Sequence, residues 1–337
     1  MIAPSTDTLV PTGSFVPRRW LANGHVMTVY AWGRQRVFSA LPAPTPRLFR
    51  VSPDTQVLAH CFWQASPREH PTVIGLHGLE ASHEAHYMQG LADKAWRRGW
   101  NVVLLNQRNC GNTEHLGPGL YHSGLTADPF AVIDELVEQD GLARLGVVGY
   151  SLGGNLAVRL AAEVGSRTDH PLVAVAAVSP TIDLERCVRA IERRRNLAYH
   201  LNFMRNLRAR MRRKAAAWPG AFDLSALGGI WSIRHFDEVF TAPYHGFAGA
   251  SDYYARASAL GVSDEVRIPT LLISAEDDPF VPGDQFREPV IRENPAIAAR
   301  VERHGGHCGF VGEPHGASDG YWAEETAVAF LAAAIGR

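Results

Sequence analysis

The sequence predicts an α/β fold with a mostly parallel central sheet, flanking helices, and a helical cap inserted late in the chain. Three observations support this. Short apolar runs typical of buried strands recur along the chain, and helical segments of ten or more residues separate them. That alternation then stops between residues 183 and 257, and it resumes afterwards. Because parallel strands need a crossover of about a dozen residues, the alternation favours a parallel sheet.

Length and composition fit a single soluble domain that spans residues 1–337. The hydrophobic fraction is 46% and the net charge is −1, so no global field points to nucleic acid as a partner. The polar start, residues 1–10, does not resemble a signal peptide, and no apolar window reaches about 18 residues. Four widely spaced cysteines predict neither disulfides nor a zinc site. We therefore expect a cytoplasmic protein, while its oligomeric state is left open.

The first elements precede the cap. An arm over residues 1–47, rich in proline and aromatic residues, is expected to pack on the body. It leads to an antiparallel edge hairpin between residues 47–51 and 56–63. The buried strands that we expect next are 72–76, 102–105, 145–148 and 172–178. The helices between them are expected at 84–98, 128–139 and 155–164.

The later elements begin with a cap over residues 183–257, which holds no clear strand. Its main feature is a long, arginine-rich helical stretch over 185–214. Apolar residues recur there at helical spacing: Leu197, Leu201, Met204, Leu207 and Met211. After the cap we expect a strand at 270–274, a helix at 285–292, a strand at 297–301 and a C-terminal helix at 321–335.

The run Gly149-Tyr150-Ser151-Leu152-Gly153 carries the first chemical signal. It follows an expected strand and precedes an expected helix, which is the setting of a nucleophile elbow. A serine on so tight a turn brings backbone segments very close, so a Cβ at either glycine would clash. We therefore predict that Ser151 is a nucleophile.

A nucleophilic serine needs a base, and the base needs a group that orients it. His307 follows the last expected strand between glycines, and Asp278 follows the strand before it with Pro282 four residues further on. Acid and base at neighbouring strand ends would meet at the carboxyl edge of the sheet. The competing residues are Asp277 and Glu276 for the acid, and His304 for the base.

Two backbone N–H groups are expected to stabilise an oxyanion, those of Leu79 and Leu152. Leu152 follows the nucleophile, and Leu79 lies in the loop after the strand at 72–76. His77 is expected to be structural. The polar residues after it could line the mouth of the site or cap the next helix: Glu80, Ser82, His83 and Glu84.

Alternative interpretations remain for the cap and for the whole constellation. The Leu/Met face of the cap helix is expected to face a pocket, with its arginines in solvent. Alternatively, a basic amphipathic helix makes peripheral contact with an anionic membrane. The constellation could also be a catalytically silent fold that binds a ligand. Phosphate-loop and dinucleotide motifs are absent from the sequence, and a dehalogenase would need aspartate at the elbow.

The chain resembles the YheT-like branch of the α/β-hydrolase family, which includes yeast medium-chain fatty acid ethyl ester synthase/esterases and animal lipid hydrolases. The resemblance rests on the elbow with Asn155 and on further runs, which are Asn23-Gly24-His25 with Thr28, His77-Gly78-Leu79 with Tyr87, Arg108-x-Cys110-Gly111, Tyr121-His122-Ser123-Gly124, Phe236-Asp237-Glu238-x-Phe240-Thr241, Asp277-Asp278-Pro279 and Gly306-His307-x-Gly309-Phe310. Asn109, where the family commonly has glycine, and the arginine-rich cap depart from the pattern.

This resemblance implies an α/β-hydrolase fold and a serine carboxylic-ester hydrolase that needs no metal or organic cofactor. Its partner would be a small-molecule ester with a short or medium acyl chain, in some members with acyl transfer. The resemblance places the triad on Ser151, Asp278 and His307. An acyltransferase, thioesterase, lactonase or lipase with the same triad remains open.

Overall fold

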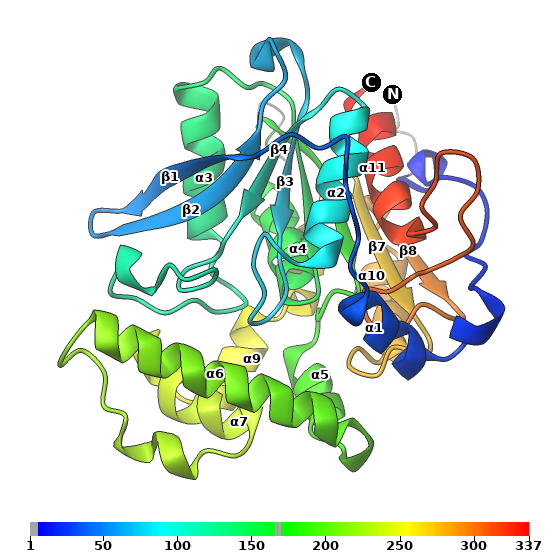
Figure 1. Cartoon of the computed structure of the whole chain (residues 1–337). Helices are drawn as coiled ribbons and strands as arrows, with labels where there is room; N and C mark the ends of the chain where they lie inside the picture. Colours follow the sequence, from blue (N-terminus) through cyan, green and yellow to red (C-terminus); the bar gives the residue numbers. More distant parts are fainter. Residues whose placement is uncertain (1–5, 166, 168–169, 337) are drawn as a thin grey trace.

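The computed structural model describes residues 6–165, 167 and 170–336. Its centre is an eight-stranded sheet in the order β1-β2-β4-β3-β5-β6-β7-β8 (Figure 1). The strands are β1 (Thr45–Ser52), β2 (Thr55–Phe62), β3 (Thr72–Leu76), β4 (Asn101–Leu105), β5 (Leu145–Tyr150), β6 (Leu172–Val178), β7 (Thr270–Ala275) and β8 (Ile297–Glu302).

The sheet is mostly parallel, as predicted. β1 pairs antiparallel with β2 at the edge, β2 pairs antiparallel with β4, and all further pairs are parallel. Every residue of β3, β4 and β5 is buried, which explains why these strands appear in the sequence as continuous apolar runs. The carboxyl ends of the parallel strands share one edge, so the loops that follow them lie together.

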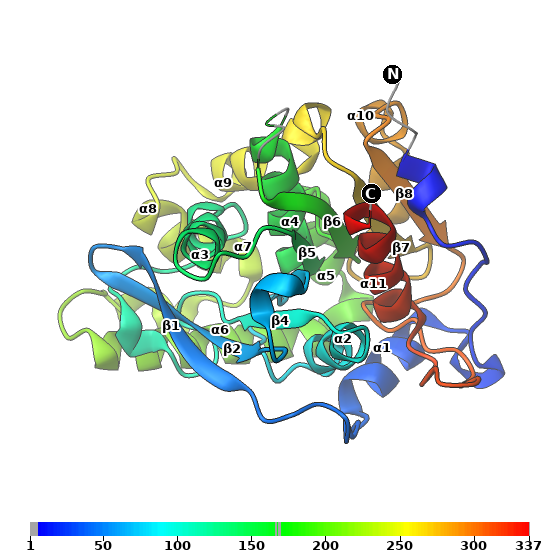
Figure 2. The ribbon, with the colours of Figure 1, turned by 90° about the horizontal axis from the view of Figure 1, so that it is seen from above.

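Helices cover both faces of the sheet (Figure 2). One apolar cluster joins α3 and α4 to one face, and a second joins α2 and α11 to the other. The helices are α1 (Gly24–Gly33), α2 (His86–Arg97), α3 (Ala127–Glu138), α4 (Leu152–Val164), α5 (Leu184–Ile191), α6 (Leu197–Ala217), α7 (Ile233–Phe236), α8 (Ala242–Tyr244), α9 (Ala250–Ala257), α10 (Pro289–Arg292) and α11 (Trp322–Ile335). No helix in the described residues is long and apolar enough to cross a membrane.

Two predicted helices are wrong in their extent. The stretch 185–214 is not one helix, because a turn over Arg194–Asn196 separates α5 from α6. The buried Asn196 amide donates to the carbonyl oxygens of Ala190 and Pro279, both at 2.7 Å, and this fixes the break. The predicted helix at 285–292 is a 3-10 turn followed by the short α10. Glu288 is extended between them, as expected for a residue before proline.

The prediction that the Leu/Met face of α6 faces a pocket is wrong, because none of its five residues lines the cavity that contains Ser151. Met204, Leu207 and Met211 are buried in the core beneath the helix, whereas Leu197 and Leu201 are exposed. The arginines do not all lie in solvent either, because Arg210 is buried. The helical pattern identified a buried stripe, but it did not identify what the stripe packs against.

The N-terminal arm contains a helix that the sequence did not predict. α1 starts at Gly24, and the side chain of Asn23 caps it by accepting a hydrogen bond from the Val26 N–H at 3.1 Å. Figure 1 shows α1 beside the carboxyl edge of the sheet, near the junction of α5 and α6. Residues 1–5 of the predicted arm lie outside the described residues.

Candidate active site

Ser151 occupies a strained turn at the carboxyl end of β5. Its φ of 53° and ψ of −117° are unusual for a residue with a side chain. A Cβ added to Gly149 would lie 2.1 Å from the Gly153 oxygen, and one added to Gly153 would lie 2.3 Å from the Leu76 oxygen. The predicted steric need for both glycines is therefore confirmed.

Asp278 and His307 lie side by side beyond the ends of β7 and β8. His307 Nδ1 is 2.9 Å from Asp278 Oδ2, and the Asp278 side chain is fully buried. Asp278 Oδ1 also accepts hydrogen bonds from the backbone N–H groups of Phe280 and Val281, at 2.8 and 3.0 Å. These bonds hold the carboxylate toward the imidazole.

The competing acids and base form separate contacts. Asp277 pairs with His304, whose Nδ1 is 3.1 Å from Oδ2, and its Oδ1 accepts a hydrogen bond from the Gly306 N–H at 2.9 Å. Glu276 forms an ion pair with Arg287 at the surface. Asp277 thus fixes the loop before His307 and does not contact that imidazole through a hydrogen bond.

The charge of Asp278 changes the proton affinity of His307. Burial by itself lowers the pKa of His307, but the adjacent Asp278 carboxylate and Cys308 raise it, and the net result is a pKa well above the usual value. An imidazole in this setting accepts a proton readily and holds it as a stabilised imidazolium.

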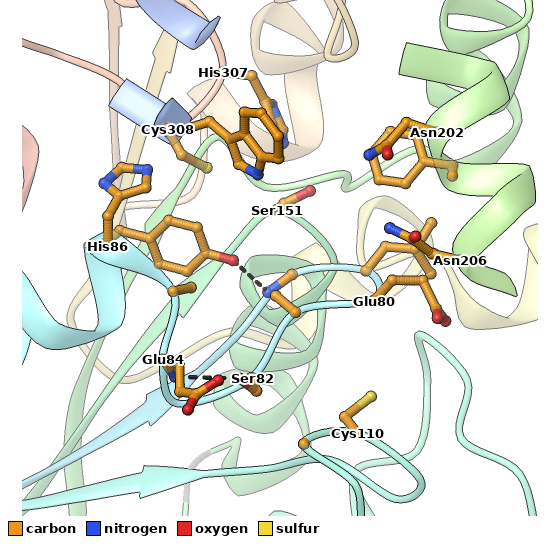
Figure 3. Close-up of a pocket in the computed structure, with 18 of the residues that line it drawn as sticks. Glu80, Ser82, Glu84, His86, Cys110, Ser151, Asn202, Asn206, His307 and Cys308 are labelled. Carbon is orange, nitrogen blue, oxygen red and sulfur yellow. Dashed lines mark hydrogen bonds between the residues drawn. The ribbon is translucent and has the colours of Figure 1, made fainter. Parts of the chain in front are cut away.

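Ser151 and His307 line one cavity of about 1140 Å³. Figure 3 shows Ser151 in this pocket between the loop that carries Glu80 and the loop that carries His307. Among the described residues, no side chain forms a hydrogen bond with the Ser151 hydroxyl. Such contacts are often long without substrate and tighten when it binds.

The loop after β3 packs directly on the elbow, since a Cβ at Gly78 would lie 3.2 Å from the Ser151 Cβ. The Gly78 N–H donates to the Tyr87 hydroxyl, and the Glu80 N–H donates to the Tyr121 hydroxyl, both at 3.1 Å. In the described part of the chain, the N–H of Leu79 between them has no acceptor. The same holds for the N–H of Leu152.

His77 supports this loop from below. Its Nε2 accepts a hydrogen bond from the Gln107 N–H at 3.1 Å, and its Nδ1 lies 2.8 Å from the Gly78 oxygen. Burial lowers the pKa of His77 to about 4, so the ring is neutral and carries its proton on Nδ1. The expectation that His77 is structural agrees with these contacts.

Three of the four polar residues after His77 line the pocket, His83 does not, and none of the four caps α2. Glu80, Ser82 and Glu84 are in its wall, whereas α2 begins at His86 without a side-chain cap. Among the described residues, no group of three or more His, Cys, Asp or Glu side chains is arranged to hold a metal ion.

Two contacts at the site were not foreseen. Thr28 in α1 accepts a hydrogen bond from the His307 N–H at 2.8 Å. Arg210 in α6 forms an ion pair with Glu80 at 2.7 Å, with both side chains almost fully buried, and its guanidinium lies 4.5 Å from the centre of the Tyr121 ring. The motif Asn23-Gly24-His25 with Thr28 could have indicated that the N-terminal arm reaches the site. For Arg210 no such signal exists, because the helical pattern does not distinguish it from the exposed arginines beside it.

The fold and this site define an α/β hydrolase. A family model described as the alpha/beta hydrolase fold matches residues 71–314, which is more than half of the chain. The chain belongs to the α/β-hydrolase fold family.

Individual relatives support this assignment. YheT of Escherichia coli is 33% identical, with 89% of this chain and 88% of that protein covered. Phospholipase ABHD3 of Homo sapiens is 28% identical, with 74% of this chain and 61% of that protein covered. Medium-chain fatty acid ethyl ester synthase/esterase 2 of Saccharomyces cerevisiae is 27% identical, and the match covers 72% of this chain and 58% of that protein.

Solved structures share the fold. The Pyrococcus furiosus esterase Pf2001 superposes with a TM-score of 0.59 at 16% identity, covering 96% of this chain and 99% of that chain. The 2,6-dihydroxy-pseudo-oxynicotine hydrolase has a TM-score of 0.60 at 18% identity, covering 92% of this chain and 72% of that chain.

Proposed function

We propose that this α/β hydrolase is a serine carboxylic-ester hydrolase that works through an acyl-enzyme. One observation carries the proposal. Ser151 sits on a strained elbow in a pocket that it shares with His307, and His307 is paired with the buried Asp278 carboxylate. Nucleophile, base and orienting acid are therefore available in the order that this fold uses.

In the proposed mechanism, Ser151 Oγ attacks the ester carbonyl while His307 Nε2 takes its proton. Asp278 fixes the imidazole with its proton on Nδ1 and stabilises the imidazolium. His307 then gives the proton to the leaving alcohol as the acyl-enzyme forms. Water attacks the acyl carbon in the second half of the reaction, and His307 again acts first as base and then as acid.

The oxyanion of each tetrahedral intermediate would be held by the backbone N–H groups of Leu79 and Leu152. Both groups lack an acceptor in the described residues, so they are free to donate to the developing charge. The Tyr87, Tyr121 and His77 contacts keep the loop after β3 in place beneath the substrate.

The substrate class that we propose is an ester with a short- or medium-chain acyl group, including esters derived from lipids. Residues 183–257 act as a cap over the site in this proposal. Aromatic and apolar side chains line one part of the pocket: Val29, Trp32, Phe38, Tyr199, Phe203 and Phe280. The names of the human and yeast relatives, a phospholipase and an ester synthase/esterase, agree with such a substrate.

The four cysteines are all free, which supports a reducing, cytoplasmic setting.

A p-nitrophenyl ester series of increasing acyl length tests activity and pocket length together. A fluorophosphonate probe should label native protein, and peptide mass spectrometry should locate the adduct on Ser151. Labelling should disappear in Ser151→Ala and fall sharply in His307→Ala. A folded protein that resists the probe would refute the nucleophile, and labelling without turnover of any ester would favour a silent binding protein.

The same acyl-enzyme could pass its acyl group to an alcohol, and the name of the yeast relative motivates a test of this second activity. Ethanol added to the ester assay should divert acyl groups from free acid to ethyl ester if transfer competes with hydrolysis. Product analysis that finds only free acid would exclude ethanol as an acceptor.

A further inference from the structure

Exposed apolar side chains surround the mouth of the pocket. α1 presents Val26, Val29 and Trp32 on one side, at a spacing of three residues, and Trp32 is 74% exposed. Val37 follows α1 and is 91% exposed. Leu197 and Leu201 project from the start of α6. We call these six residues the mouth surface: Val26, Val29, Trp32, Val37, Leu197 and Leu201.

The two halves of the mouth surface are joined across the pocket entrance. The His25 ring in α1 stacks on the Tyr199 ring in α6, and His25 Nδ1 lies 3.3 Å from the Tyr199 hydroxyl oxygen. Figure 1 shows α1 close to the end of the cap where α6 begins. Trp32 and Val37 are exposed and also line the pocket, so the surface is continuous with the cavity that contains Ser151.

The chain around the mouth surface is cationic. Residues 17–38 and 193–222 contain no aspartate or glutamate. In the described part of the chain, seven exposed arginines from these segments have no carboxylate within 4.0 Å: Arg19, Arg34, Arg193, Arg194, Arg195, Arg205 and Arg212. Two acids line the pocket itself, and one of them, Glu80, is neutralised by Arg210.

We propose that the mouth surface docks on an anionic lipid interface, with the pocket opening toward the lipid. Exposed tryptophan and aliphatic side chains beside arginines suit the boundary between headgroups and acyl chains. A second copy of this chain fits the same surface poorly, because face-to-face contact would bring the unpaired arginines together. The delivery of lipid esters to Ser151 from this interface rests on the proposed function.

This surface differs from the amphipathic face of α6 that the sequence suggested. Met204, Leu207 and Met211 are buried inside the protein, so that face is not available to a membrane. The first turn of α6 contributes instead, together with α1.

Vesicle sedimentation tests the docking. The full chain should pellet with vesicles of phosphatidylglycerol and phosphatidylcholine, should stay in solution with pure phosphatidylcholine, and should be released by salt. Arg193→Gln, Arg194→Gln and Arg195→Gln combined should weaken binding roughly a hundredfold, since each arginine near an anionic surface contributes about fivefold. Val26→Ser, Leu197→Ser and Leu201→Ser combined should weaken it roughly tenfold or more.

The matched control is Leu48→Ser with Trp231→Ser, which removes exposed apolar side chains away from the mouth and should bind like the parent. Equal binding by the parent and both mouth variants would overturn the proposal. So would a concentration-dependent dimer, seen by analytical ultracentrifugation, that the mouth variants abolish. Ser151→Ala should lose turnover of a water-soluble ester and keep vesicle binding, so failure of the proposed function is distinguishable from failure of docking.

Discussion

Thr28 and His307 are 279 positions apart in the chain, yet the Thr28 hydroxyl accepts a hydrogen bond from the His307 N–H at 2.8 Å. The same hydroxyl donates to the Gly24 oxygen at 2.6 Å. Gly24 leaves no room for a side chain, because a Cβ there would lie 1.8 Å from the Asp277 oxygen. The N-terminal arm therefore holds both loops that carry the proposed acid and base.

Thr28→Val should lower kcat toward p-nitrophenyl esters about tenfold with little change in KM. The variant keeps the shape of the side chain but leaves the partly buried His307 N–H without an acceptor, at a cost of about 1–3 kcal/mol. Thr28→Ser retains the hydroxyl and should recover most of the activity. Equal loss in both variants would assign the effect to packing rather than to the hydrogen bond.

Asp278→Asn should shift the acidic limb of the pH profile to lower pH while the maximal rate falls by about 10⁴. In the parent, Asp278 raises the pKa of His307, so kcat/KM should rise with pH only as the imidazolium loses its proton above the usual histidine range. Without the carboxylate, burial dominates and the pKa of His307 falls. Asp277→Asn is the control, and the acidic limb of its pH profile should lie at the same pH as in the parent.

Arg210→Met should destabilise the fold by about 3–5 kcal/mol in urea unfolding, because it leaves the Glu80 carboxylate buried without its partner. Arg212→Met, at an exposed position of the same helix, should change stability by about 0.5 kcal/mol or less. Glu80→Gln with Arg210→Met removes both charges and should recover part of the loss. A double variant no more stable than Arg210→Met alone would argue against an uncompensated charge as the cause.

Asn109 has a left-handed backbone with φ of 65°, and its side chain donates to the Gly119 oxygen at 3.0 Å. Asn109→Ala should cost about 1–2 kcal/mol of stability, because alanine loses this bond and tolerates the left-handed conformation less well than asparagine does. Asn109→Gly should cost less, since glycine adopts this φ freely. Thermal melts of the two variants would show the order, and a glycine variant less stable than alanine would contradict it.

Local patterns were enough to predict most of the sheet and the elbow. Residues 72–76 and 172–178 were predicted as strands with the bounds that the structure has, since continuous apolar runs between turn signals depend on few long-range contacts. The steric role of Gly149 and Gly153 is also local, because both belong to the turn that holds Ser151.

Contacts between distant segments were beyond sequence reasoning. The break before α6 depends on the Asn196 amide reaching Pro279, and the place of Arg210 depends on Glu80 lying beneath it. Asp277 and Asp278 are adjacent in the chain but bond to different histidines. A proline spacing favoured Asp278, but only the three-dimensional course of the two loops shows which imidazole each carboxylate meets.

The contacts between α6 and the loops at Glu80 and Glu114 matter for the design of chimaeric enzymes. Besides the Arg210–Glu80 pair, two contacts fix the C-terminal end of α6 to the loop at 114–117. Arg213 forms an ion pair with the Glu114 carboxylate, and the buried Lys214 donates to the backbone carbonyl oxygen of Glu114 at 3.0 Å. If the segment 183–257 came from a relative without these cations, the carboxylates of Glu80 and Glu114 in the recipient would lose their ion-pair partners. Successful exchange of substrate preference by transplantation should therefore require moving Glu80 and Glu114 together with residues 183–257.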